Sequence, residues 1–398
     1  MAVTRKRNRN VLFIGLLSFF GGISQDIFAP LLPIYLGSVL HFDKTFIGLA
    51  DGILNSSVSI FKIVAGYLSD KLRSRKRLIF FGYFLSAISR PLLAIFSGSI
   101  GVLLLRFLDG AGKGIKDAPK DALLADSTVS QNRGKSFGVY RALDTFGSVV
   151  GPVLLSGLLL LLASNNSKYQ IIFLLTGLPL IVTLLLIVFK VKETQSASKQ
   201  TARDSGKRLP ATFYVFLAIV LFFAFASSSD TFLILRSQDL GVGIIAIPLV
   251  YAVFNFIYAS ASIPLGSLSD RIGREKVIIL GWVFFAVTYF GFALANQAYQ
   301  AWILFGLYGV YHATAEGVSK AFIADIVGSG YRGRAYGIYN SALGLIALPS
   351  SFLAGLLWEK YGSAAPFLFA TGVAVIAIIF LGLFLKFYLP QHKLANLN

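Results

Sequence analysis

The stretch GYLSDKLRSRKRL, which begins at Gly66, returns 200 residues further along the chain as GSLSDRIGREKVI, which begins at Gly266. A second pair, LADSTVSQNRGKSFGVYRAL from Leu124 and IADIVGSGYRGRAYGIYNSAL from Ile323, repeats at an offset of 199. Each copy of the first stretch joins two apolar segments through a short basic turn. The chain is therefore predicted to contain two similar halves.

The composition indicates a membrane protein. Hydrophobic residues make up 56% of the 398 residues and charged residues only 14%, whereas a soluble domain carries about 25% charged residues. A helix needs roughly 20 apolar residues to cross the hydrocarbon core, and it satisfies its own backbone hydrogen bonds. We predict an all-α integral membrane protein with twelve transmembrane helices in two pseudo-symmetric six-helix bundles, at about 11–37, 46–68, 78–97, 100–125, 135–163, 170–190, 211–234, 244–268, 276–295, 299–325, 335–357 and 364–389.

The sequence offers little for enzyme chemistry. It contains no cysteine and one methionine, at position 1, so disulfides, thiolate metal ligands and cysteine nucleophiles are excluded. No nucleophile–base arrangement or metal-ligand cluster is recognisable, and no appended soluble domain suggests a sensor. We therefore expect no catalytic residue, no metal, no cofactor and no nucleic-acid partner.

The net charge is +18, and the Lys and Arg residues are distributed unequally between the two sides of the membrane. Of the 36 Lys and Arg residues, 24 fall at one set of span ends and four at the other, namely Lys44, Lys168, Arg236 and Lys360. Basic residues accumulate on the cytoplasmic side, so both termini are predicted to be cytoplasmic. The short loops suggest a prokaryotic inner membrane. The remaining eight cations lie within spans: Lys62, Arg90, Arg106, Lys113, Lys116, Lys120, Arg141 and Lys320.

One connection differs from the others in composition. Residues 191–210 (VKETQSASKQTARDSGKRLP) are polar, basic and rich in Ser and Thr. We interpret them as a mobile cytoplasmic linker. The predicted domains are an amino-terminal six-helix bundle at 1–190, the linker at 191–210, and a carboxy-terminal six-helix bundle at 211–398.

The basic turns resemble the cytoplasmic gate motif G-x-L-x-D-R-x-G-R-[RK] of the major facilitator superfamily. The first copy supplies Gly66, Asp70 and Arg75, with Arg73 and Ser74 where the motif has Gly and Arg; the second supplies Gly266, Asp270, Arg271 and Arg274. Two further motifs of the family, R-x-x-x-G in span four and G-x-x-x-G-P in span five, are matched by Arg106 and Gly110 and by Gly147, Gly151 and Pro152.

This resemblance implies a secondary transporter that works by alternating access, with its site between two rocking halves. Within the family the span-five motif is associated with antiporters, which favours export. The residues of the two turns and of the span-five motif (Gly147, Gly151 and Pro152) become gating candidates. Glycines let helices approach closely, and an aspartate at a helix end can pair with arginine. A plain basic loop is the alternative interpretation of the turns.

Span four carries charges that a bilayer should exclude. Arg106, Asp109, Lys113 and Lys120 recur at spacings of three, four or seven, with Lys116 or Asp117 between the last two, and so share one helix face. The spacing of four favours ion pairs between Asp109 and Lys113 and between Lys113 and Asp117. A cation at the bilayer centre costs roughly 2.5–3.5 kcal/mol, so this face must meet protein or water.

Two interpretations of these charges are open. A surplus of cations in a water-filled cavity attracts an anion, which makes Arg106, Lys113, Lys116, Arg90 and Arg141 substrate-binding candidates. The alternative is a neutralised network of ion pairs that locks the amino-terminal half, built from Asp109, Asp117, Asp144 and Arg141.

The proton-coupling candidates come mainly from span ten. His312 and Glu316 lie four residues apart and align with Lys113 and Asp117 at the offset of 199. Histidine titrates near neutral pH, and a desolvated glutamate can do so. Asp26 (SQDIF) and its counterpart Asp230 (SSDTF) are the alternatives, and His312 as a hydrogen-bonded packing residue is the competing interpretation.

These features predict a proton-coupled secondary active transporter that moves a small organic anion or zwitterion, with a carboxylate-type metallophore as one candidate and export as the expected direction. The alternative is a polyspecific multidrug/proton antiporter, which the span-five motif and the aromatic content favour and the cationic stripe disfavours. The expected partners are a small-molecule substrate, the proton and the lipid bilayer, and the protein is expected to be a monomer.

Overall fold

The computed structural model describes residues 2–72, 74–128, 133–194, 209–327 and 331–388, without the side chains of 2–8, 70–72, 133–135, 315–316 and 388. The regular structure in these ranges is helical, without strands. Two compact units divide the chain. Unit 1 comprises Met1–Lys199 and Gly243–Ala252, and unit 2 comprises Gln200–Val242 and Val253–Asn398.

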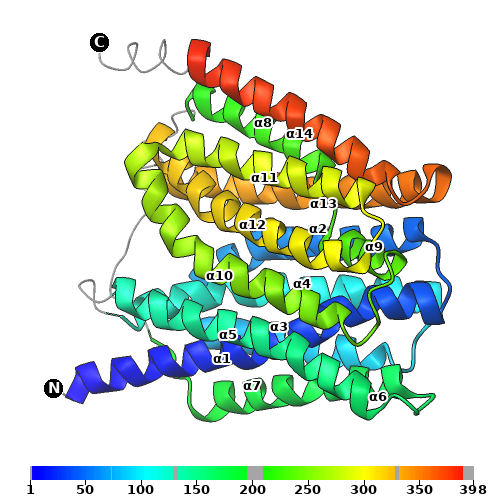
Figure 1. The fold of residues 1–398 in the computed structure, drawn as a ribbon. Coiled ribbons are helices and arrows are strands. Elements are labelled where there is room, and N and C mark those ends of the chain that lie inside the picture. The colour runs from blue at the N-terminus through cyan, green and yellow to red at the C-terminus, as the bar shows by residue number, and fades with distance from the viewer. Residues whose placement is uncertain (1, 73, 129–132, 195–208, 328–330, 389–398) are drawn as a thin grey trace. The chain divides into compact units, whose positions relative to one another are not determined.

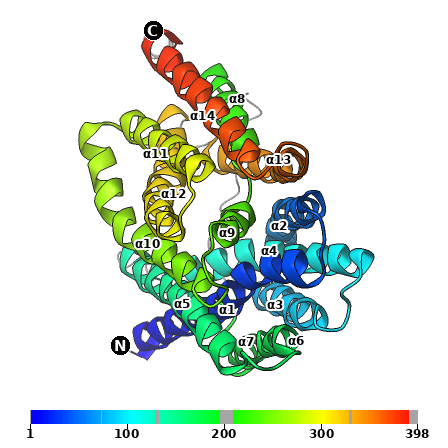
Figure 2. The same ribbon diagram turned by 45° about the vertical axis from the view of Figure 1, so that its right-hand side comes forward.

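The helices follow the predicted order (Figure 1, Figure 2). The first half contains α1 (Ala2–Ile34), the π-helical turn η1 (Tyr35–Val39), α2 (Lys44–Leu72), α3 (Arg75–Leu92), α4 (Ser99–Asp126), α5 (Arg133–Leu161), α6 (Lys168–Leu175) and α7 (Gly177–Phe189). The second half contains α8 (Ala211–Ala226), α9 (Asp230–Asp239), α10 (Ile247–Ile272), α11 (Arg274–Leu294), α12 (Ala298–Ile326), α13 (Arg332–Tyr361), α14 (Ala365–Leu383) and the π-helical turn η4 (Phe384–Tyr388).

The predicted all-α fold is confirmed, and the described helices account for all twelve spans. The sixth span is divided into α6 and α7, and the seventh into α8 and α9. Within the described residues, nine spans are long and apolar enough to cross a membrane by length and composition alone. The other three, α3, α4 and α12, include the helix with the charged stripe, whose polarity must be met inside the protein.

The sequence repeat is also a repeat of packing. In unit 1, α1 packs against α5 and α7, and α3 packs against α4 and α7. In unit 2, the counterparts of these helices make the same pairs: α8 packs against α13 and α14, and α11 packs against α12 and α14. Each unit therefore buries its own apolar faces in the same way.

The seventh span breaks at three consecutive serines between α8 and α9. Ser229 caps the new helix by accepting a hydrogen bond from a backbone N–H of its first turn, at 3.3 Å. The Ser350 hydroxyl donates to the carbonyl oxygen of Ser227 at 3.0 Å, and the Tyr289 hydroxyl donates to that of Ser228 at 3.4 Å. Side chains thus supply the partners that backbone groups need at membrane depth.

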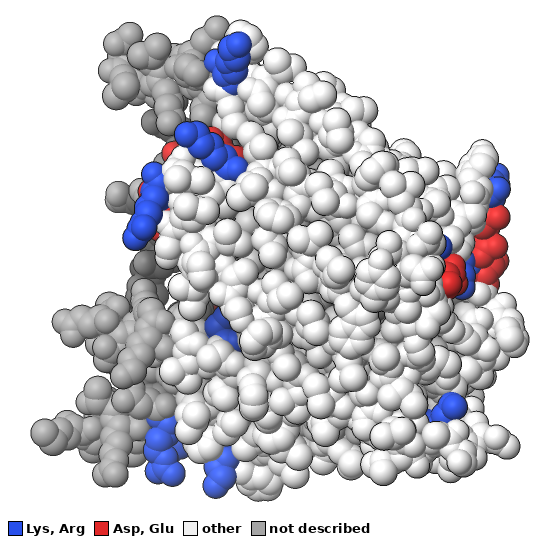
Figure 3. All heavy atoms as spheres, in the orientation of Figure 1, with Lys and Arg blue, Asp and Glu red and all other residues white. Residues whose placement is uncertain are grey.

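The exposed surface of the helices is largely apolar. Ile63 is 54% exposed, Leu104 58% and Phe290 47%. On the face drawn in Figure 3, the visible Lys, Arg, Asp and Glu side chains lie mostly near helix ends, and the surface between them is almost free of charge. Extended exposed apolar surface of this kind marks contact with a membrane or a partner, and here it fits helices that face lipid.

Glycines bring α3 and α4 together. A methyl group on Gly82 would lie 2.5 Å from the carbonyl oxygen of Gly112, and one on Gly112 would lie 2.6 Å from that of Gly82. Neither position can carry a side chain without moving the backbone. This close approach sets Arg90 of α3 beside Asp109 of α4.

Replacing Gly82 by alanine is expected to destabilise the protein by about 1–3 kcal/mol, the usual cost of overpacking, because a backbone oxygen cannot turn aside as a side chain can. Thermal unfolding of the detergent-solubilised protein measures the effect. Gly138→Ala in α5 is the control, since a methyl group there would meet no atom within 4 Å. Equal melting temperatures for the two variants would contradict the packing argument.

Candidate functional site

The buried side chain of Arg90 on α3 connects this helix to α1 and α4. It is 2% exposed and Asp109 is 1% exposed. The Arg90 Nε donates to Asp109 Oδ1 at 3.1 Å, Nη1 donates to Ser24 Oγ at 2.8 Å, and Nη2 donates to Gln25 Oε1 at 2.7 Å. The guanidinium group is therefore directed at protein groups on α1 and α4, and it fixes the geometry around Asp109.

Arg106 is likewise engaged by protein groups. It is 4% exposed and forms an ion pair with Asp51 of α2. The guanidinium carbons of Arg106 and Arg90 each lie 5.7 Å from the ring centroid of Phe28, a distance at which cation–π attraction operates. One aromatic ring on α1 thus lies close to two like charges. Asp51 and Phe28 were missed by the sequence prediction.

Lys113 shares Asp109 with Arg90. Its Nζ lies 3.6 Å from Asp109 Oδ2, so the predicted pair at a spacing of four is present. Each oxygen of Asp109 thus faces a different cation. The Lys113 side chain is 14% exposed, against 2% for Arg90. Of the two cations on this carboxylate, Lys113 is therefore the more exposed.

A second shared carboxylate lies two turns further along α4. Asp117 Oδ1 is 3.1 Å from Lys116 Nζ and 3.9 Å from Lys120 Nζ. The helical spacing also allowed a pair between Asp117 and Lys113, but the structure pairs Asp117 with these two lysines. The Lys116 ammonium lies 4.9 Å from the ring centroid of Tyr83, and that of Lys120 lies 5.5 Å from the ring centroid of Tyr140.

Arg141 differs from the other substrate-binding candidates because it is open to its surroundings. Its side chain is 60% exposed, and its Nη1 lies 3.4 Å from Asp144 Oδ2 one turn along α5. The five candidates therefore fall into three groups. Arg90 and Arg106 are buried and paired, Lys113 and Lys116 are partly exposed and share carboxylates, and Arg141 is exposed.

Asp26, one of the predicted proton-coupling candidates, is a buried carboxyl of unit 1. It is 6% exposed and hydrogen-bonds with the Ser148 side chain of α5. The charges of Lys113, Arg90 and Asp144 act on it. A carboxyl in this position balances the cations when it is ionised and leaves them in excess when it is protonated.

The candidate His312 lies among aromatic rings in unit 2. Its ring meets four others edge to face, with centroids at 5.2, 5.9, 4.6 and 5.0 Å, from Phe254, Tyr258, Tyr308 and Tyr311. His312 is therefore packed among aromatic side chains, as its interpretation as a packing residue expects.

Asp230 connects to the same aromatic group. The Tyr308 hydroxyl donates to Asp230 Oδ1 at 2.7 Å, and the Tyr308 ring is the one closest to His312. Asp230 is the first residue of α9, directly after the break in the seventh span. The side chain of Glu316 lies outside the described residues.

The gate-like turns form the same ion pair in both halves. Arg75 at the start of α3 pairs with Asp126 at the end of α4. In the second half, Arg274 at the start of α11 pairs with Asp325 near the end of α12, at 3.1 Å. Arg274 also lies 3.7 Å from the predicted gate residue Asp270. Each unit thus ties two helix ends together within itself.

The other residues of the turns make fewer contacts. A methyl group on Gly66 would lie 3.9 Å from the nearest side chain, and one on Gly266 would meet no atom within 4 Å. Arg271 is exposed. The side chain of Asp70 lies outside the described residues. Close helix approach at Gly66 and Gly266 is therefore not part of the structure described.

The span-five motif packs α5 onto α1. A methyl group on Gly147 would clash with the carbonyl oxygen of Phe19, and one on Gly151 would lie 2.9 Å from that of Ile23 and 3.2 Å from Asp26 Cβ. Pro152 follows inside α5 and is buried. The motif thus determines how closely α5 passes the candidate proton site.

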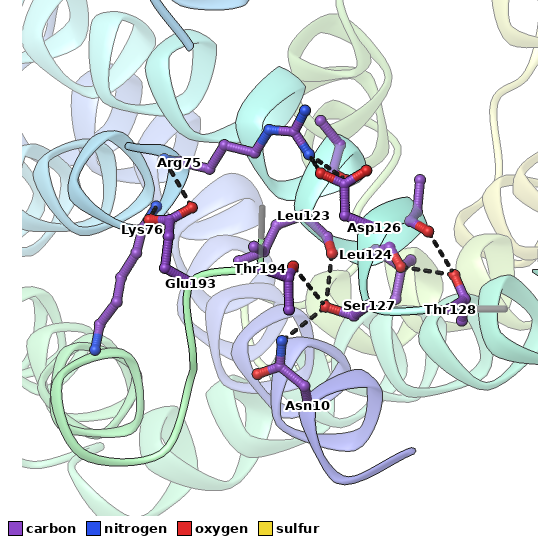
Figure 4. A network of polar contacts seen from close by, with 12 residues as sticks. Asn10, Arg75, Lys76, Leu123, Leu124, Asp126, Ser127, Thr128, Glu193 and Thr194 are labelled. Carbon is purple, nitrogen blue, oxygen red and sulfur yellow. Dashed lines mark hydrogen bonds and ion pairs between the residues drawn. The ribbon is translucent and has the colours of Figure 1, made fainter. Parts of the chain in front are cut away.

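The four residues Val191–Thr194, which follow α7, contact α1, the start of α3 and the residue after α4, and we call them the clasp (Figure 4). Val191 is 2% exposed and belongs to the core cluster. The Asn10 side chain of α1 pairs with the backbone of Lys192 in both directions, at 2.9 and 3.1 Å. The described start of the predicted linker is therefore part of the unit 1 core.

The clasp also holds the ends of α3 and α4. The Glu193 carboxylate accepts hydrogen bonds from the backbone N–H groups of Arg75 at 3.1 Å and Lys76 at 2.8 Å, which caps α3 where Ser74 makes no side-chain cap. The Thr194 hydroxyl lies 3.3 Å from that of Ser127, which follows α4. These contacts support the ion pair at the same helix ends, and polar composition alone gave no sign of them.

Two repeated halves of membrane-crossing helices, with charges buried along one of them, define a multi-pass integral membrane protein of the transporter class. A model of the Major Facilitator Superfamily matches residues 14–235 and 211–397. The chain belongs to this superfamily, whose members are transporters and not enzymes.

Similar proteins agree with this assignment. An uncharacterized MFS-type transporter of Methanocaldococcus jannaschii is 34% identical over 379 residues, which covers 94% of each chain. The multidrug resistance protein MdtG of Proteus mirabilis is 26% identical over 98% of each chain. Among solved structures, a mutant of the nucleoside transporter NupG has a TM-score of 0.81 at 14% identity, covering 94% of this chain and all of that one. That likeness shows the fold.

Removing Arg90 is expected to destabilise the protein far more than removing Arg141. Arg90→Ala leaves the buried Asp109 without its main partner, and breaking a buried pair costs about 3–5 kcal/mol. Arg141→Ala removes an exposed pair worth at most about 1 kcal/mol. Thermal unfolding of both purified variants checks the order. A stable Arg90→Ala protein would show that this guanidinium is dispensable for the fold.

Proposed function

We propose that the protein is a proton-coupled secondary active transporter for a small organic anion or zwitterion, working by alternating access in a prokaryotic inner membrane with both termini in the cytoplasm. Membership of the superfamily supports transport. The span-five motif favours antiport with protons and export, with carboxylate-type metallophores among the candidate substrates.

One observation carries the choice of an anion. On the inner face of α4, Asp109 and Asp117 each lie between two cationic side chains. One carboxylate cannot neutralise two cations, so cations are in excess when Asp26 is protonated, and an uncompensated charge at membrane depth is costly. A substrate carboxylate would supply the missing charge. Lys113 and Lys116 are the cations best suited to receive it. Both are partly exposed, and each shares its aspartate with another cation.

The double variant Lys113→Ala, Lys116→Ala is expected to lose transport of the anion by at least about 100-fold, the scale of two charge-assisted hydrogen bonds. Uptake of radiolabelled citrate, succinate and an anionic metallophore into proteoliposomes with an imposed pH gradient measures it. Lys44→Ala, Lys168→Ala is the matched control, with the same charge change at the ends of other helices. Undiminished transport by the first variant would refute the binding assignment.

We propose Asp26 as the proton site that couples to this anion. Its burial, its hydrogen bond with Ser148 and the charges of Lys113 and Arg90 that act on it support this choice. His312 and Glu316 in unit 2, and Asp230 beside Tyr308, are the competing candidates.

Asp26→Asn is expected to abolish the response of transport to a pH gradient while it leaves exchange of labelled for unlabelled substrate at equal pH. The amide keeps the size of the carboxyl but cannot bind and release a proton. His312→Gln, Glu316→Gln and Asp230→Asn are measured alongside. A full pH response in Asp26→Asn together with its loss in one of these three would assign the proton elsewhere. The sign of the gradient that accelerates uptake distinguishes antiport from symport.

A multidrug/proton antiporter is the second candidate, and the similarity to the Proteus mirabilis multidrug resistance protein favours it. The aromatic group around His312 would suit planar apolar compounds. Thermal-shift measurements with carboxylates and with lipophilic cations separate the two. Stabilisation by lipophilic cations alone would favour the multidrug function.

A further inference from the structure

We propose that α4 carries a second anion subsite, formed by the ammonium groups of Lys116 and Lys120 around Asp117, through which the substrate passes on its way to or from the site at Lys113. This inference rests on the proposed function, because it assigns the subsite to the same class of small carboxylate. It adds Lys120 to the residues that meet the substrate.

The geometry around Asp117 is that of a two-point receptor for an oxyanion. Both ammonium groups approach the same oxygen, Oδ1, at 3.1 and 3.9 Å, which limits the separation of the two Nζ atoms to about 7 Å. A carboxylate or another small oxyanion that bridges Lys116 and Lys120 can therefore take the place of Asp117. Each bridging contact would be a charge-assisted hydrogen bond, the stronger kind.

Two aromatic rings hold the lysines ready. The Tyr83 ring of α3 lies 4.9 Å from the Lys116 ammonium, and the Tyr140 ring of α5 lies 5.5 Å from the Lys120 ammonium. Cation–π attraction keeps each ammonium near its ring. The receptor is thus partly preorganised before an anion binds, which lowers the entropy lost on binding.

Exposure distinguishes this carboxylate from Asp109. The Asp117 side chain is 31% exposed, whereas that of Asp109 is 2% exposed. Eight residues of α-helix separate the two aspartates, a distance of about 12 Å along α4. Asp117 is therefore the more accessible of the two carboxylates, while the Lys120 side chain beside it is 7% exposed. Asp117 lies towards the end of α4 that holds the Arg75–Asp126 pair, which is the predicted cytoplasmic end.

Asp117 is the carboxylate in contact with both of the ring-backed lysines, so it is the internal competitor that a substrate anion must displace.

Because Asp117 competes with the anion for the lysines, removing its charge should raise the affinity for the anion. Asp117→Asn removes the competing charge but keeps the lysines and the rings, so the purified full-length protein is expected to bind citrate about tenfold more tightly, the gain from one fewer displaced charge-assisted contact. Asp121→Asn, four residues on and exposed, removes the same charge without that contact and should change the affinity less than about twofold. Isothermal titration calorimetry in detergent or nanodiscs measures both.

Adding Lys120→Gln to Asp117→Asn should return the affinity to the wild-type value or below. Asp117→Asn with an affinity no higher than that of Asp121→Asn would overturn the subsite, and so would a gain that survives Lys120→Gln. Either result counts against the subsite alone if the wild-type protein transports the anion in proteoliposomes. Tighter citrate binding by Asp117→Asn in a protein that transports no anion would support the subsite and contradict the proposed transport function.

Discussion

The structure of unit 1 depends on how the charges of α4 are paired away from lipid. A cation in hydrocarbon is expensive, so every charge on this helix must meet a partner, an aromatic face or water. Arg90 on α3 and Asp51 on α2 bring partners for Asp109 and Arg106, and the Gly82–Gly112 contact allows α3 to come close enough. The packing of α2 and α3 against α4 therefore also provides the partners for its buried charges.

The fold was predictable because its signals are local or periodic. Long apolar segments fix the spans, and the repeat that begins at Gly66 and Gly266 predicts that both halves pack alike, as they do. Periodicity along α4 also predicted the pair between Asp109 and Lys113. For Asp117 the spacing of four predicted Lys113 as the partner, but the structure pairs it with Lys116 and Lys120. The ammonium groups of these two lysines also lie near rings of other helices, Tyr83 and Tyr140.

The contacts that sequence reasoning missed join segments far apart in the chain. The Glu193 cap on α3 and the pairing of Asn10 with Lys192 lie in a stretch whose polar composition predicts only a linker. Phe28 is one of 36 phenylalanines, and nothing in its local sequence marks it as the ring beside two guanidinium groups. Such roles arise only once the helices are packed, because they depend on which faces meet.

Comparison of the repeats separates what holds the fold from what defines the function. The ion pair that ties adjacent helix ends recurs as Arg75–Asp126 and Arg274–Asp325, as expected for a structural requirement of each unit. At mid-helix the repeats diverge: the position of Lys113 is taken by His312 in the second half, and the His312 ring lies among aromatic rings. In the function we propose, the partly exposed lysines of α4 serve the anion, whereas the buried pairs of Arg90 and Arg106 serve the fold.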